Sequence, residues 1–115
     1  MSGTEAVVVF CTVPAAEARA LVDPLLEERW IACVNILGPL TSRYLWKGKI
    51  EEGEEVLLLM KSRGDLVSGL RRRIQELHSY DVPEVLEVAV QGGLQEYIDW
   101  VVESCGPEDA ATPES

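Results

Sequence analysis

The chain has few of the residues from which catalytic and metal centres are usually built. Its 115 residues include one histidine, one phenylalanine and three cysteines, and no two cysteines have Cys-x-x-Cys spacing. A single histidine excludes a two-histidine or three-histidine metal site within one chain. The missing Cys-x-x-Cys pattern argues against dithiol exchange. Because no nucleophile is paired with a base in a recognisable pattern, an enzyme is the least favoured class.

Basic residues are also scarce, since 10 Lys and Arg face 20 Asp and Glu and the formal net charge is -10. Nucleic-acid binding needs a basic face, and docking on anionic lipid needs clustered Lys and Arg, so we expect no nucleic acid and no membrane as partners. No apolar run approaches the ~20 residues of a membrane span. The first residues lack a signal-peptide pattern, and three widely spaced cysteines favour free thiols. We therefore expect a cytoplasmic protein.

Hydrophobic patterning predicts the element order βαββαβ followed by a last helix, which is typical of the α+β ferredoxin-like fold. The predicted strands are 6–13, 31–37, 41–46, 50–60 and 85–90, with a turn at 47–49 that makes a long hairpin. The predicted helices have their apolar faces between residues 18 and 26, 66 and 77, and 94 and 102. Gly38-Pro39 should break the second strand, Pro24 should kink or divide the first helix, and Asp65 should cap the second.

A single domain is expected over residues 1–105, and the remaining ten residues are acidic and lack periodicity. We predict that residues 106–115 form a disordered tail. The glutamate pairs at 51–52 and 54–55 are interpreted as a solvated face of the hairpin that blocks aggregation. Much of the negative charge then lies on the hairpin and the tail, so the net charge alone does not indicate a cation site.

Three residues could contribute a metal ligand, and each also has a simpler structural interpretation. Cys11 is either a buried small hydrophobe or a soft thiolate ligand for copper or zinc. His78 is either a residue at the end of a helix or an imidazole ligand. Cys33, between two apolar residues, is more simply a core thiol. Glu84, like the nearby Asp81 and the more distant Lys61, fits an ion pair or a solvated edge as well as a pocket.

Two aromatic residues stand out on the predicted hairpin, whose outer half has too few apolar residues to be stable alone. Tyr44 and Trp46 alternate along it and therefore point to the same face. We favour packing of these rings against another subunit. The run Arg71–Arg73 is interpreted as a solvated helix face, which could also meet the acidic hairpin of a neighbouring subunit.

Several segments together resemble the CutA divalent-cation tolerance family, in order and from residue 6 to residue 104. The most specific are a Tyr-x-Trp-x-Gly-Lys hairpin that begins at Tyr44 and a His-x-Tyr-x-x-Pro-Glu loop that begins at His78. The other matching stretches are 8–14, 32–36, 42–51, 59–62 and 97–100. On these residues the chain is identified as a member of the family.

The resemblance implies a PII-like homotrimer of ferredoxin-like subunits, linked to tolerance of copper and other divalent metals. It assigns the metal-linked thiol to Cys11 and the loop histidine to His78, with Glu84 as a possible carboxylate ligand. Further family positions at the inter-subunit cleft are Tyr44, Trp46, Lys61, Tyr80, Pro83, Tyr97 and Trp100. Ser79 stands where the family usually has proline, and Leu77 where some members have a second histidine, so the resemblance implies weaker or less selective metal binding.

The leading hypothesis is therefore a non-enzymatic cytoplasmic trimer that binds divalent metal, copper first, at sites shared between subunits. The alternative is a PII-like signalling module whose cleft binds a small anionic ligand or a protein partner. Lys61, Tyr44, Trp46, Tyr97 and Trp100 would line that cleft.

Overall fold

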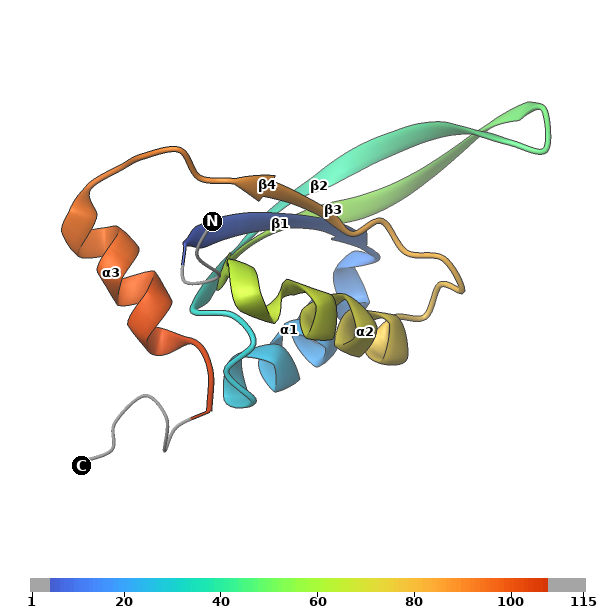
Figure 1. The fold of residues 1–115 in the computed structure, drawn as a ribbon. Coiled ribbons are helices and arrows are strands. Elements are labelled where there is room, and N and C mark those ends of the chain that lie inside the picture. The colour runs from blue at the N-terminus through green and yellow to red at the C-terminus, as the bar shows by residue number, and fades with distance from the viewer. Residues whose placement is uncertain (1–4, 108–115) are drawn as a thin grey trace.

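The computed structural model describes residues 5–107 and has one four-stranded antiparallel sheet with three α-helices (Figure 1). In chain order the elements are β1 (Ala6–Val13), α1 (Ala18–Glu27), β2 (Cys33–Trp46), β3 (Lys49–Arg63), α2 (Val67–Leu77), β4 (Leu86–Ala89) and α3 (Gln95–Ser104). The strands lie in the order β2-β3-β1-β4. The predicted α+β class is confirmed. No helix in the described part of the chain is long and apolar enough to cross a membrane.

The core lies between the sheet and the pair of helices α1 and α2, which cover one of its faces (Figure 1). In β1 the residues Val7, Val9, Cys11 and Val13 are buried, whereas the residues between them are half-buried. This period of two places alternate side chains on the helix-covered face. The helices contribute the complementary apolar stripes, with the buried residues Leu21, Val22 and Leu25 of α1 and Val67, Leu70 and Ile74 of α2.

The hairpin of β2 and β3 is longer and more continuous than the sequence predicts. β2 runs through Gly38-Pro39, where the structure shows a shift of register between Leu37 and Leu40 in place of the predicted break. A bulge takes up the irregularity, and pairing with β3 then resumes on the far side. The predicted turn is confirmed, because Lys47 and Gly48 both have positive φ, as a two-residue hairpin turn requires.

Two predictions for the helices need correction, namely the division of the first helix at Pro24 and the cap of the second by Asp65. α1 includes Pro24 without a break, and a separate 3-10 turn over Ala15–Glu17 precedes it. The missing N–H of Pro24 leaves the Ala20 carbonyl, on an exposed part of the helix, for solvent. Asp65 does not cap α2, since it lies inside a 3-10 turn and accepts a hydrogen bond from Arg63 Nε at 2.6 Å.

Two arginines hold the end of α3 against the rest of the domain. Arg63 Nη1 donates to the carbonyls of Val102 and Cys105, each at 3.2 Å. Arg29 Nε donates to the Gly106 carbonyl at 2.6 Å, and the Gly106 N–H donates back to the Arg29 carbonyl at 2.9 Å. The fixed chain thus includes Gly106, the first residue of the predicted tail. Residues 108–115 of that tail lie outside the described residues.

Candidate functional site

The outer half of the β2–β3 hairpin and the loop of residues 78–84 line a groove of about 1030 Å³. Its charged lining consists of five carboxylates and a single arginine, and we call it the acidic groove. The carboxylates are Glu51, Glu54, Glu55, Asp81 and Glu84, the arginine is Arg43, and the aromatic residues are Tyr44, Trp46 and Tyr80. Such a lining gives a negative potential that attracts cations and repels anions.

Tyr44 and Trp46 lie on one face of the hairpin, as their spacing predicts. Tyr44 pairs with Glu51 and Trp46 with Lys49 across the ladder, and both aromatic side chains line the groove. About half of each is exposed, at 50% for Tyr44 and 59% for Trp46. Lys47 Nζ lies 5.8 Å from the centre of the Trp46 ring, so this ring already faces a cation.

Glu55 is buried at the foot of the acidic groove, which corrects its predicted place on a solvated face. Ser42 Oγ donates to Glu55 Oε1 at 2.6 Å, and Tyr80 Oη donates to Glu55 Oε2 at 2.7 Å. Burial and the hydrogen bond to Glu55 raise the pKa of Tyr80 to about 12, so its hydroxyl stays protonated and keeps donating at neutral pH. This network joins the 78–84 loop to the hairpin.

His78 follows α2 directly and is buried, with 8% of its surface exposed. The Tyr80 N–H donates to Nδ1 at 3.1 Å, and Nε2 lies 2.8 Å from the Thr12 carbonyl. A carbonyl only accepts, so these partners assign the proton to Nε2 and the lone pair to Nδ1. Because that lone pair already accepts from Tyr80, His78 ligates a metal only if this hydrogen bond opens.

Cys11 points from β1 into the core and is fully buried. Burial raises the pKa of its thiol to about 12, and the carboxylates of Glu84 and Glu55 add to the effect. Metals bind the thiolate, which is almost absent at neutral pH when the pKa is this high. Within one chain the environment of Cys11 therefore fits its simpler interpretation as a buried small hydrophobe.

Glu84 is the predicted ligand that solvent reaches, since it is exposed and lines the acidic groove. Within residues 5–107 of a single chain, no three His, Cys, Asp or Glu side chains lie close enough together to hold a metal ion. A site with three protein ligands at the groove would therefore need a ligand from a second chain or a rearranged loop.

The remaining predicted residues lie away from the groove. Lys61 donates to Asn35 Oδ1 near the start of β2. Tyr97 stacks near Trp100 on α3, with ring centres 5.6 Å apart. The Tyr97 hydroxyl also lies 3.4 Å from Cys33 Sγ, in an exposed contact, so Cys33 is not the core thiol that its neighbours predict.

Within one chain, then, the predicted cleft residues do not form one cluster, and most of them lie in two groups at opposite ends of β2. Tyr44, Trp46 and Tyr80 line the acidic groove near its distal end. Lys61 and Tyr97 lie beside residues at its beginning. Pro83 lines a second cavity beside α2.

Sequence reasoning missed Ser42 and Glu55 as parts of the site. Glu55 immediately precedes the apolar run 56–60, so its position next to the core was the available signal. The pattern of adjacent glutamates outweighed that signal and favoured a solvated face.

Comparison with known proteins gives a consistent result across the domain. Residues 7–104 match the family model described as CutA1 divalent ion tolerance protein. The divalent-cation tolerance protein CutA of Thermus thermophilus is 44% identical over 100 residues, which cover 86% of this chain and 97% of that protein. The chloroplastic protein CutA of Arabidopsis thaliana is 38% identical over 99 residues, 85% of this chain and 54% of its own length.

Solved structures agree with the sequence matches. The Cut A1 structure from Thermus thermophilus has a TM-score of 0.85 at 43% identity, covering 88% of this chain and 99% of that one. A structure from Archaeoglobus fulgidus, described as a periplasmic divalent cation tolerance protein CutA, has a TM-score of 0.82 at 33% identity. It covers 86% of this chain and 97% of that one.

Proposed function

Because the chain belongs to the CutA divalent-cation tolerance family, we propose that it binds divalent metal ions and serves metal tolerance without catalysing a reaction. The observation that carries this proposal is the acidic groove, with five carboxylates against one arginine. Arg43 itself pairs with Glu52 at 3.1 Å, which further reduces its effect on the groove. Cation binding also fits the groove better than the anionic ligand of the alternative hypothesis.

Glu84 is the first ligand in this proposal, with Asp81 beside it on the same loop. Cys11 and His78 are buried and become ligands only if the His78–Tyr80 hydrogen bond opens and the thiol loses its proton. Copper is the first metal to test, because Cu²⁺ binds a given set of nitrogen and oxygen ligands more tightly than the other divalent first-row ions.

We propose further that three copies assemble as a PII-like homotrimer of ferredoxin-like subunits, so that a second chain completes each metal site. Exposed apolar side chains support an assembly: Leu45 is 76% exposed, Ile50 65% and Leu86 60%. Leu45 and Ile50 pair with each other across the hairpin, so their exposed side chains form an apolar surface that a second chain could cover. Light scattering after gel filtration should give about three times the 12.7 kDa mass of one chain. A monomer mass would contradict the assembly.

A cytoplasmic location completes the proposal. The three cysteines are free thiols, which a reducing compartment preserves. Fractionation of the native host, with a blot of each compartment, tests the location directly.

The metal site is tested by calorimetric titration of Cu²⁺ into the native protein and Glu84→Gln. Glu27→Gln is the matched control, because Glu27 is exposed on α1 and does not line the groove. We expect Glu84→Gln to weaken copper binding at least tenfold, and Glu27→Gln to leave it unchanged. Cys11→Ser and His78→Ala then show whether the loop opens. Equal binding by all variants would contradict a site at the groove.

A further inference from the structure

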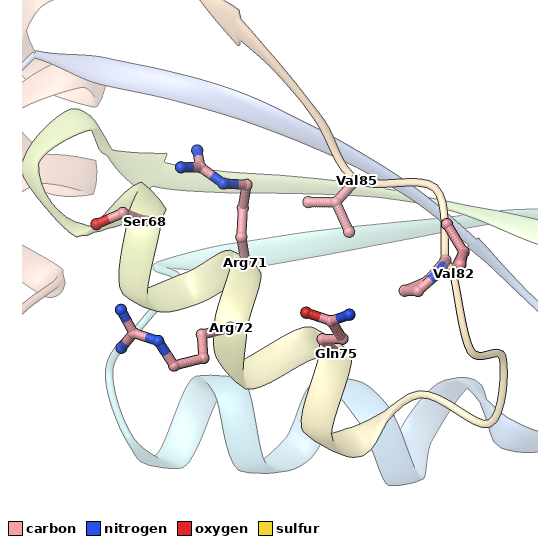
Figure 2. A pocket seen from close by; sticks show the side chains of 7 residues that line it. Ser68, Arg71, Arg72, Gln75, Val82 and Val85 are labelled. Carbon is pink, nitrogen blue, oxygen red and sulfur yellow. The ribbon is translucent and has the colours of Figure 1, made fainter.

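A second cavity lies between α2 and the segment of residues 82–85 (Figure 2). Its volume of about 370 Å³ is near the lower end of the range for small-molecule sites. Four polar residues of α2 form one wall, and the apolar residues Val82, Pro83 and Val85 form the other. Only Val82 is shared with the acidic groove. The cavity is therefore a separate concave site with a different chemical character.

The polar wall follows from the spacing of residues on α2. Ser68, Arg71, Arg72 and Gln75 stand at positions i, i+3, i+4 and i+7, which share one side of a helix. Figure 2 shows Arg71 and Gln75 projecting on the side of Val85, and Arg72 leaving the helix on the adjoining side. All four residues are exposed, so their donors are open to a ligand from solvent.

The three consecutive arginines of α2 differ in how many hydrogen bonds and ion pairs they already make with protein groups. Arg73 is fully engaged, with two contacts of 2.8 Å to Glu28 and one of 3.1 Å to Glu76. Arg71 uses one nitrogen, Nη1, for Glu87 at 3.2 Å. Arg72 has no polar side-chain partner within residues 5–107. Two guanidinium groups and one carboxylate thus leave the cavity with a net positive charge.

We propose that this cavity binds a small organic phosphate, with the phosphate held by Arg71 and Arg72 and the carbon body against Val82, Pro83 and Val85. A guanidinium group donates two parallel hydrogen bonds to phosphate oxygens, and phosphate offers enough oxygens for both arginines together with the neighbouring hydroxyl and amide. The apolar wall supplies a surface that inorganic phosphate cannot use. The contact with Glu87 occupies only Nη1 of Arg71 and leaves its other guanidinium nitrogens for a ligand.

The test is calorimetric titration of the full chain with glycerol 3-phosphate, and separately with inorganic phosphate and with glycerol. Arg72→Gln removes the unengaged guanidinium from an exposed position, so the fold is retained. Arg19→Gln is the matched control, because Arg19 is exposed on α1 and does not line the cavity. This substitution removes the same charge at a different place on the surface. We expect Arg72→Gln to weaken glycerol 3-phosphate binding at least tenfold and Arg19→Gln less than twofold.

Each arm of the experiment has a decisive outcome. Saturable binding of glycerol 3-phosphate that is tighter than that of inorganic phosphate, and is lost in Arg72→Gln, supports the site. Equal affinity for the ester and for inorganic phosphate would overturn the role of the apolar wall. Equal losses in the two arginine variants would show a general charge effect and overturn the site. Absence of saturable binding to the native chain would overturn it as well, without bearing on copper at the acidic groove.

Discussion

Replacing Tyr80 with phenylalanine removes a single oxygen from the link between the 78–84 loop and the hairpin. In the native chain Tyr80 and Ser42 each donate to one oxygen of Glu55, at 2.7 and 2.6 Å. Glu55 is only 9% exposed, so its carboxylate loses a donor that solvent replaces poorly. We therefore expect Tyr80→Phe to lower the free energy of unfolding.

The size of the loss follows from the charge and the exposure of the two partners. A hydrogen bond to a charged group contributes about 1.5–3 kcal/mol. Tyr80 is 38% exposed, which lets some water reach the vacated position, so we expect the low end of that range, about 1.5–2 kcal/mol. Urea unfolding followed by circular dichroism measures it, at one fixed protein concentration because assembly would add to the stability.

Tyr97→Phe is the matched control for this measurement. It removes the same atom from an exposed contact of 3.4 Å with Cys33, and we expect a loss below about 0.5 kcal/mol. The reasoning is refuted if the two variants lose the same stability.

The pH dependence supplies a second test of the same network. The pKa of Tyr80 is raised from its ordinary value of 10 to about 12, so the network contributes fully below pH 10. This contribution is lost as the pH rises from 10 to 12. The free energy of unfolding of Tyr80→Phe should therefore fall less between pH 10 and pH 12 than that of the native protein.

Other groups in the domain give three more expected results. Thiol labelling of the native protein at pH 8 should leave Cys11 and Cys105 unmodified until urea unfolds the chain, because both are buried with raised pKa values; rapid labelling of Cys11 would contradict the packing. His78→Ala leaves the Thr12 carbonyl and the Tyr80 N–H unpaired and should cost about 2–3 kcal/mol in urea unfolding. Arg63→Gln should speed hydrogen exchange in α3 and leave exchange in α1 unchanged, because the helix carbonyls that Arg63 binds are at the end of α3. Equally faster exchange in both helices would contradict this.

Local patterns were enough to predict the elements that position the site. The continuous apolar run of residues 6–13 identified β1, the apolar spacing identified α2, and Lys47-Gly48 identified the turn. Each of these signals is contained within a few neighbouring residues. Gly38-Pro39 was misread because its local signal resembles a strand end, whereas pairing with β3 carries β2 past it.

The contacts within the site depend on residues far apart in the sequence, and patterns alone could not reveal them. The spacing of Tyr44 and Trp46 predicted a shared face, because a strand repeats every two residues. The state of His78 depends on the Thr12 carbonyl, 66 positions away. The Glu55 carboxylate accepts a hydrogen bond from Tyr80, 25 positions away. No spacing rule connects such pairs, so their chemistry becomes visible only in the folded chain.

The segment of residues 78–85 lines both the acidic groove and the cavity beside α2. Binding of a ligand at one of these sites can therefore affect binding at the other. His78 fixes the beginning of the loop, pairing of Leu86 with Phe10 fixes the strand that follows, and Tyr80 ties it to the hairpin. Val82 lines the acidic groove and the cavity beside α2. A ligand that displaces Val82 from one side therefore changes the wall on the other. By linkage, any factor by which a bound metal alters phosphate affinity must equal the factor by which phosphate alters metal affinity.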